Sequence, residues 1–450
     1  MERRGAPVSA PAIVESPALR LPGQHFVVAL VFLALGSVGL IWIAPELAAG
    51  LYLSPHVAAV THCFTLGWLT TTIFGALYQL LPVALGARIR WKFLGYVSLW
   101  CYGPGVALFA TGIAAQSLML RDAGIALITV GILCVIINVA SSLWVATKRD
   151  EVWAAIAIAL FFLSSTLVLG MVLARNLHTG FLAATRVRML GVHMHVAMVG
   201  WVLLMIVGIS HRLLPMFLLA HSASMRLTRY AIGLLVAGVL TFAAGMLCGL
   251  AHLPAAASTW IAWAGLGMIE GGILCYLLQV RRVFAARMRP KLDAGLLHVP
   301  VSLSFLAASA LLGPFVLHGG IALPRLDIAY VMLGLLGGLT LFAIGQFYKI
   351  VPFLIWIARY RHEMGRKRVP ALAELYSSNA AHHGLVAFTV AVSALAAGEA
   401  FGSTLVLRAA ACLFSFGVLL FAGQMVRVAF GTPKHAAGAE TTDTRAAMAR

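Results

Sequence analysis

Twelve apolar stretches, each about as long as a lipid bilayer is thick, run through the chain. They cover residues of roughly 26–45, 56–83, 93–115, 122–146, 152–174, 188–217, 228–250, 258–280, 296–318, 327–357, 378–398 and 404–430. A helix needs about 20 apolar residues to span the hydrocarbon core. Only 10% of the 450 residues are charged, whereas soluble domains contain about a quarter. The sequence therefore predicts an all-α integral membrane protein with about twelve transmembrane helices.

The formal net charge of +18 would suit a nucleic-acid-binding protein, but the basic residues are placed as membrane topology demands. One set of loops contains most of them: Arg88, Arg90, Lys92, Lys148, Arg149, Arg226, Arg229, Arg281, Arg282, Arg287, Arg289, Lys291, Arg359, Arg361, Arg366, Lys367 and Arg368. The other loops contain only Arg121, Arg175, Arg186, Arg188, Arg325 and Arg408. Because basic loops stay on the cytoplasmic side, we expect a bacterial-type inner-membrane protein with both termini in the cytoplasm. Topology and contact with anionic lipid account for the charge, so nucleic acid is not an expected partner.

One expected transmembrane segment occurs twice in the sequence. The stretch THCFTLGWLTTTIFGALYQLLPV begins at Thr61, and MHVAMVGWVLLMIVGISHRLLPM begins at Met194. A shift of 133 residues superposes seven positions: His62 on His195, Gly67 on Gly200, Trp68 on Trp201, Gly75 on Gly208, Leu80 on Leu213, Leu81 on Leu214 and Pro82 on Pro215. These segments are the second and sixth expected spans, which predicts a repeat of four spans.

A third copy is expected in the tenth span, and MLGLLGGLTLFAIGQFYKIVPF from Met332 supplies it at an offset of 137. Gly337 matches Gly67, and Met332 stands where His62 and His195 stand. We therefore predict three pseudo-threefold arcs of four helices at about 25–148, 149–291 and 292–432. A cytoplasmic N-terminal segment, 1–24, precedes them, and a disordered cytoplasmic tail, 433–450, follows.

Twelve spans in three arcs of four, with a histidine early in the second span, resemble subunit I of the haem–copper oxidase superfamily. The wording HCFTLGWLTTTIFGALYQLLP is most similar to the divergent oxidase-like branch and to the NnrS nitric-oxide-response family. In the superfamily the histidine of the second span is a haem ligand, which implies that role for His62. A histidine of the sixth span binds copper, which implies that role for His193 or His195. The superfamily's histidines in the seventh and tenth spans are missing here.

His62, His193 and His195 are expected in the outer third of the membrane, where an ionisable residue marks a functional site. Imidazole suits both haem iron and copper. His193 and His195 are two residues apart on a helix, so they point about 200° apart, and the repeat makes His195 the inward one. No Cys-x-x-Cys-His motif is present, so non-covalent haem b is expected rather than haem c.

Other polar residues add weaker signals. Met332 is a candidate for the second axial position, because a thioether also binds haem iron. Arg186 and Arg188 are candidates to pair with haem propionates. Glu270, inside the eighth span, suggests either proton movement or a hydrogen bond to a neighbouring helix. A polar ring at the inner ends of the repeated spans reads as interfacial: Tyr78, Gln79, His211, Arg212, Tyr348 and Lys349.

Two functions are compatible with these features. The first is a membrane haem b protein, with copper as a further cofactor, that handles electrons or a diatomic gas such as oxygen or nitric oxide. If it is an enzyme, it is an oxidoreductase of the haem–copper oxidase or nitric oxide reductase type. Its partners would be a small electron-donor protein or quinol, and additional subunits. The alternative is a cofactor-free membrane transporter with a threefold internal repeat.

Overall fold

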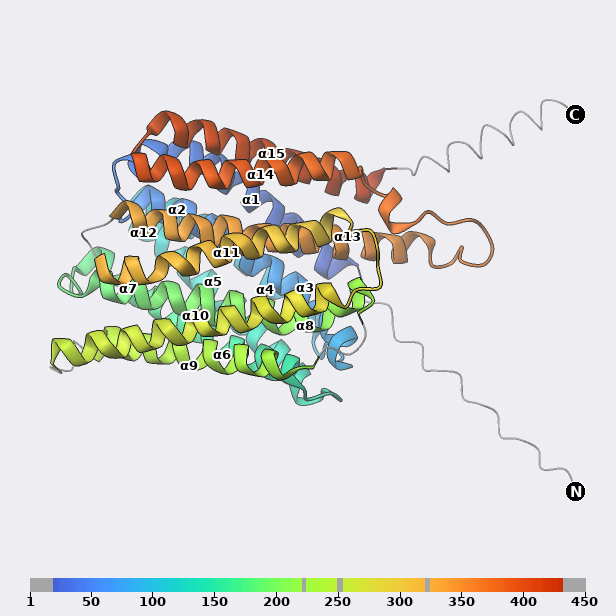
Figure 1. Cartoon of the computed structure of the whole chain (residues 1–450), viewed down its shortest axis with the longest axis horizontal. Coiled ribbons are helices and arrows are strands. Elements are labelled where there is room, and N and C mark those ends of the chain that lie inside the picture. Colours follow the sequence, from blue (N-terminus) through green and yellow to red (C-terminus); the bar gives the residue numbers. More distant parts are fainter. Residues whose placement is uncertain (1–18, 221–223, 249–253, 320–323, 432–450) are drawn as a thin grey trace, which may run out of the picture.

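The computed structural model describes residues 19–220, 224–248, 254–319 and 324–431, and every secondary-structure element in these ranges is helical. Twelve helices within them are long and apolar enough to cross a membrane, one at each predicted stretch. In Figure 1 they run side by side along the longest axis of the molecule. The chain is an all-α multi-pass membrane protein, as the composition predicts. The expected tail, 433–450, lies outside the described residues.

The helices follow one another in three arcs of four, and the second helix of each arc contains a π-helical segment. Arc 1 contains α1 (Arg20–Ala48), then α2 (Pro55–His62), η1 (Cys63–Thr70) and α3 (Thr71–Leu85) in one span, then α4 (Lys92–Ala114) and α5 (Leu118–Trp144). Arc 2 contains α6 (Glu151–Thr179), then α7 (Arg186–His195), η2 (Val196–Leu203) and α8 (Leu204–Leu218), then α9 (Arg226–Cys248) and α10 (Ala255–Ala285). Arc 3 contains α11 (Ala294–Gly319), then α12 (Pro324–Val331), η4 (Met332–Thr340) and α13 (Leu341–Tyr360), then α14 (Ser378–Phe401) and α15 (Thr404–Phe430).

The first helix begins earlier than the apolar stretch indicates. α1 starts at Arg20, because Leu21 and Pro22 are buried against the bundle and extend the helix beyond the purely apolar run. Proline is tolerated there because the first helical turn has no intrahelical partner for its missing N–H. The short 3₁₀ helix η5 (Leu372–Glu374) lies in the long loop between α13 and α14.

The second helices of the arcs form the centre of the bundle. The most apolar 18-residue windows of these three spans are 89%, 67% and 78% buried, whereas those of the other nine are between 33% and 56% buried. Trp201 in η2 donates its Nε1–H to the Thr70 Oγ1 of η1 at 3.1 Å, which joins two of the three π segments directly. The duplicated sequence therefore builds the core, and the remaining helices surround it.

Each π segment contains a glycine covered by a phenylalanine of the first helix of the same arc. A Cβ atom on Gly67 would lie 2.4 Å from the Phe32 ring, and one on Gly200 would lie 2.6 Å from Phe162. In arc 3, Gly337 would meet Phe305 at 2.5 Å. The small repeated glycine thus leaves space for an aromatic ring, and a phenylalanine side chain of the same arc fills this space.

A second threefold contact lies two turns further along. Positions seven residues before the phenylalanines carry His25, Ala155 and His298, and their Cβ atoms cover Gly75, Gly208 and Gly345 respectively. In all three arcs, the two residues of the first helix that cover these glycines are seven positions apart. The arcs therefore share one internal geometry.

The third and fourth helices of each arc form a hairpin held by small residues. A Cβ on Gly124 of α5 would lie 2.4 Å from the backbone nitrogen of Phe109 in α4, and one on Gly265 of α10 would lie 2.2 Å from that of Phe242 in α9. In the α14–α15 hairpin, Gly417 faces the ring of Phe388. Such close crossing is typical of membrane helices, where van der Waals contact drives association. In Figure 1 the α9–α10 and α14–α15 hairpins form opposite edges of the molecule.

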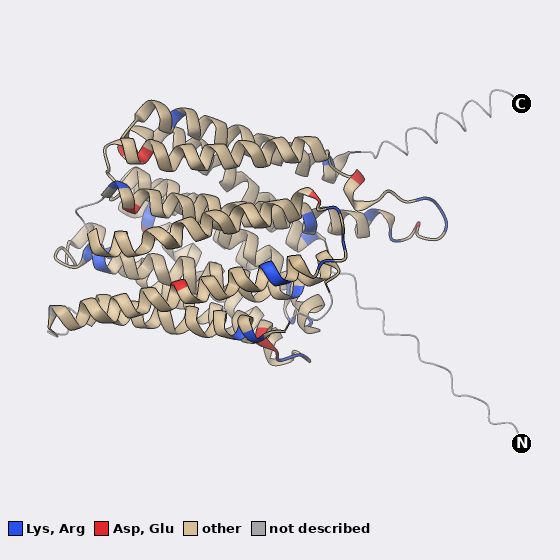
Figure 2. Ribbon diagram, in the orientation of Figure 1, with Lys and Arg blue, Asp and Glu red and all other residues tan. Residues whose placement is uncertain are grey.

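Lysines and arginines gather mostly at the end of the bundle where α3, α8 and α13 finish (Figure 2). This end is called the basic end below. There Arg212 of α8 pairs with Asp150 at 2.8 Å, and Lys349 of α13 pairs with Asp293 at 2.5 Å. The equivalent position in arc 1 is Gln79, which is buried. The prediction that the polar ring lies at the membrane interface therefore does not hold for all its members. Tyr78 and Tyr348 are buried inside the bundle.

We expect Gly67→Ala to lower stability markedly, because the new methyl group would overlap the Phe32 ring and force one helix outward. Overpacking of this kind costs about 1–3 kcal/mol. Thermal unfolding in detergent, followed by the monodisperse fraction after heating, measures the loss. Gly233→Ala in α9 is the control, because no atom lies within 4 Å of its added methyl group. Equal stability of the two variants would contradict the packing argument.

Candidate functional site

The two repeated histidines stand directly before the π segments. His62 is the last residue of α2 before η1, and His195 is the last residue of α7 before η2. In the third copy, η4 begins at Met332 itself. π-helical turns are rare and occur mostly at functional sites, because they break the regular hydrogen-bond ladder and turn side chains to new directions. The structure thus places both histidines where the helix changes its winding.

His62 is held in one tautomer. Its Nδ1 lies 2.7 Å from the Ala58 carbonyl oxygen one turn earlier. A carbonyl oxygen only accepts, so Nδ1 carries the proton and Nε2 keeps a free lone pair. The edge of the Phe109 ring, 5.1 Å away between centroids, packs against the imidazole. Metal-binding histidines characteristically donate their other N–H to a backbone carbonyl, so His62 has the arrangement of a ligand.

His193 faces the same cavity as His62, although the two come from different arcs. Gly170 of α6 makes room for it, since a Cβ there would lie 3.3 Å from the His193 Cε1. The His193 Nδ1 is buried and has no hydrogen-bond partner among the described residues. Two imidazoles therefore meet at the junction of arcs 1 and 2.

The cavity between these histidines is largely apolar. The space in it that a water-sized molecule can occupy is about 70 Å³. Ligand pockets usually enclose roughly 300–1,000 Å³, so this cavity is narrow. Its walls come from α2, η1, α4, α5, α6, α7 and η2: Thr65, Leu66, Thr70, Phe109, Ile125, Ile128, Ile132, Leu163, Thr166, Leu167, Gly170, Met171, Ala197, Met198 and Trp201. The Trp201–Thr70 hydrogen bond lies on this wall. Three threonines are the only polar side chains in the lining besides the two histidines and the Trp201 N–H, so an apolar ligand held through its metal would suit it.

His195 faces a different junction, between arcs 2 and 3. Its Nδ1 donates to the Gly191 carbonyl at 2.8 Å, so its Nε2 is the acceptor for the Tyr330 hydroxyl at 3.3 Å. Phe242 packs on the ring at 4.3 Å, as Phe109 packs on His62. The opposite directions of His193 and His195 agree with their spacing on the helix. His195 does not line the cavity that His62 and His193 share.

The repeat register explains these pairings. His62, His195 and Met332 are equivalent, and the residues two positions earlier are Val60, His193 and Tyr330. At each junction, the residue equivalent to His62 comes from one arc, and the residue equivalent to His193 comes from the next arc. The pair is His62 with His193 between arcs 1 and 2, and His195 with Tyr330 between arcs 2 and 3. The third pair in this register, Met332 and Val60, has no imidazole.

The remaining candidate residues lie apart from the shared cavity. Met332 is buried in η4 and is not among the residues that line it. Arg186 and Arg188 lie in the first turn of α7, where Arg186 is half-buried and Arg188 exposed. Arg186 is seven residues before His193, hence on the same face of the helix and about 10 Å further out. Within the described ranges, no three His, Cys, Asp or Glu side chains gather as a metal cluster.

Glu270 of α10 lies near the His195 junction. Its Oε1 is buried, has no hydrogen-bond partner in the described part of the chain, and lies beside Gly313 of α11. The expected hydrogen bond to a facing helix is therefore not present at this oxygen. Tyr330 lies within electrostatic range of the Glu270 carboxyl group.

Sequence reasoning identified His62, His193 and His195 but missed the residues that pair with or surround them. Tyr330 could have been found, because it occupies the repeat position of His193. Met171 and Met198 could not, since they lie on different helices and no spacing relates them to His62. No protein-family model and no curated protein matches the chain. Fold and site therefore define the class: a threefold twelve-helix membrane protein with two imidazoles in the lining of one apolar cavity.

We expect Tyr330→Phe to leave the fold intact but to weaken the contact between arcs 2 and 3, because His195 loses its hydrogen-bond donor. Side-chain hydrogen bonds between membrane helices contribute about 0.6 kcal/mol on average, so the loss of unfolding free energy should be about that size. Unfolding in mixed micelles measures it. Tyr230→Phe removes a hydroxyl from a side chain that is 62% exposed and serves as the control. A larger loss in the control would show that this hydrogen bond is not stabilising.

Proposed function

We propose that the chain is a membrane haem b protein in which His62 and His193 would hold the iron. The observation that carries this proposal is that two imidazoles from different arcs face one apolar cavity. The proposal also explains why the junction of arcs 1 and 2 is the one with two imidazoles, while the other two equivalent positions carry a His–Tyr pair and a Met–Val pair.

The donor atoms present fit such a group, and the cavity of about 70 Å³ would have to widen, through movement of the side chains that line it, to admit a porphyrin. The His62 Nε2 carries a lone pair whose direction is fixed by the Nδ1–H bond to Ala58. Apolar walls raise the potential of a bound haem and exclude water from it. Arg186, two turns before His193 on the same face of the helix, would pair with a propionate in this proposal. Haem b bound by two imidazoles supplies one-electron redox chemistry.

The two histidines differ in how firmly they are held. His62 has an oriented ring, whereas the His193 Nδ1 has no partner in the described part of the chain. Both imidazoles would hold the haem for electron transfer, which is the function that this arrangement favours over gas chemistry. His193 is the imidazole whose movement would break fewer hydrogen bonds.

The setting of this function follows the charge distribution. We propose that the basic end faces the cytoplasm of a bacterial-type cell, which places the imidazole pair in the outer third of an inner membrane. A small electron-donor protein or quinol would then be the electron source, with additional subunits as further partners. Whether the chain completes a reaction by itself, as an oxidase-type oxidoreductase would, depends on what binds at the second junction.

We expect the purified protein, supplied with haem during expression, to show a b-type absorption spectrum with a low-spin Soret band. His62→Ala and His193→Ala should each lose or shift this band, because each removes one axial imidazole. His195→Ala is the matched control and should keep it, because its Nε2 already accepts a hydrogen bond from Tyr330. Haem retained unchanged in both His62→Ala and His193→Ala would rule the assignment out. No haem in any preparation would leave the transporter as the better reading.

Copper at His195 is tested separately by elemental analysis. His195 belongs to no group of three or more His, Cys, Asp or Glu side chains in the described residues, so we expect less than one copper per chain. Copper equal to the protein concentration, lost in His195→Ala and kept in His62→Ala, would instead establish the two-metal form that the superfamily resemblance implies.

A further inference from the structure

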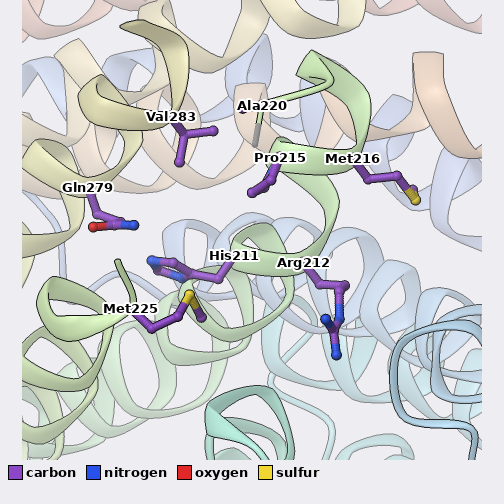
Figure 3. A pocket seen from close by; sticks show the side chains of 8 residues that line it. All are labelled: His211, Arg212, Pro215, Met216, Ala220, Met225, Gln279 and Val283. Carbon is purple, nitrogen blue, oxygen red and sulfur yellow. The ribbon is translucent and has the colours of Figure 1, made fainter. Parts of the chain in front are cut away.

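A second cavity lies at the basic end, between α8, α10 and the residues just before α9. Its volume is about 330 Å³, it is partly open to the outside, and Figure 3 shows the side chains around it. Its lining consists of His211, Arg212, Pro215, Met216, Ala220, Met225, Gln279 and Val283. His211 is 16 residues after His195 along the same span, so the cavity is about 24 Å from the histidine level of the first site.

Two polar side chains in this lining are buried and unsatisfied. His211 is 7% exposed and Gln279 is 1% exposed. The His211 Nδ1 donates to the Val207 carbonyl oxygen, so its Nε2 keeps a lone pair, and this atom has no partner among the described residues. The Gln279 Oε1 is likewise without a partner there. In Figure 3 the two side chains extend toward each other from α8 and α10. Buried polar groups are normally paired, so both are arranged for a ligand.

The surroundings are basic on one side and apolar on the other. Arg212 lies beside the cavity and is paired with Asp150 at 2.8 Å through one amino group, which also donates to the Ala84 carbonyl oxygen. Arg226 directly follows Met225, and the exposed Arg282 lies one turn after Gln279. Pro215, Met216, Ala220 and Val283 form the apolar part of the wall. No Asp or Glu is among the lining residues.

We propose that this cavity binds the headgroup of an anionic phospholipid whose phosphodiester carries a hydroxylated group, as in phosphatidylglycerol. The amide NH₂ of Gln279 and the remaining N–H groups of Arg212 donate to phosphate oxygens. The two unpaired acceptors, His211 Nε2 and Gln279 Oε1, accept from the headgroup hydroxyls, which a choline headgroup lacks. The apolar wall contacts the glycerol backbone and the start of the acyl chains. Basic pockets between transmembrane helices at this depth are suited to such headgroups.

Free inorganic phosphate offers the same acceptors and also carries a hydroxyl, but it leaves the apolar wall unused. A lipid uses this wall as well. The lipid is therefore the better occupant, and the inference stands whether or not the first site holds haem.

The test titrates the full chain in mild detergent with phosphatidylglycerol and follows bound lipid by native mass spectrometry. Gln279→Glu keeps the side-chain size but places a carboxylate against the phosphate, so affinity should fall about tenfold or more. Gln79→Glu is the matched control, a buried glutamine in arc 1 outside this cavity. A second pair guards against misfolding: His211→Phe should weaken binding severalfold, and His298→Phe, a buried histidine in arc 3, should not.

Selective loss in Gln279→Glu and His211→Phe, with phosphatidylcholine binding poorly to the unaltered chain, supports the proposal. Equal binding by all four variants overturns it. Equal binding of phosphatidylcholine overturns the role of the hydroxyl and the charge. Displacement of the lipid by millimolar inorganic phosphate, with no dependence on acyl chains, overturns the lipid in favour of a soluble phosphate.

Discussion

The contact between a phenylalanine and a glycine, made once in each arc, is the interaction on which the rest of the bundle depends. Phe32, Phe162 and Phe305 each lie on the glycine of a π segment, at a distance that leaves no room for a methyl group. The contact sets how close the outer helix of an arc comes to the centre. Since lipid offers no hydrophobic drive between helices, such close packing is what holds them together. It also fixes the winding of the segment that follows each histidine, and thereby where the imidazole points.

Much of the fold could be read from the sequence, because hydrophobic length and glycine spacing are local properties. The twelve spans and the three-by-four order follow from the apolar runs and from the 133- and 137-residue offsets. The start of α1 was placed too late, because buried Leu21 and Pro22 lie before the purely apolar run. The interfacial reading of Tyr78 failed for a different reason: a helix end buried by neighbouring arcs looks the same in sequence as one that meets lipid headgroups.

The sequence predicted the histidines of the candidate site but not how they are paired. His62 and His195 were found because the repeat marks them, and the opposite directions of His193 and His195 follow from helix geometry. What the sequence could not give is which imidazole meets which, because that depends on how adjacent arcs are rotated against each other. The structure pairs His62 with His193 and gives His195 to Tyr330. One threefold frame therefore carries three chemically different junctions, and only the side chains at two register positions distinguish them.

The hairpins formed by the third and fourth helices have a consequence for how the chain is made. In α4–α5, α9–α10 and α14–α15, glycines bring together helices that are neighbours in sequence. Such a pair can assemble as soon as its second helix has left the ribosome and entered the bilayer, before the next arc exists. The central helices, whose contacts reach across arcs, can complete their packing only when the last arc has been inserted. The architecture therefore implies an order of assembly: the peripheral pairs form first, the junction of arcs 1 and 2 closes next, and the junctions with arc 3 close last.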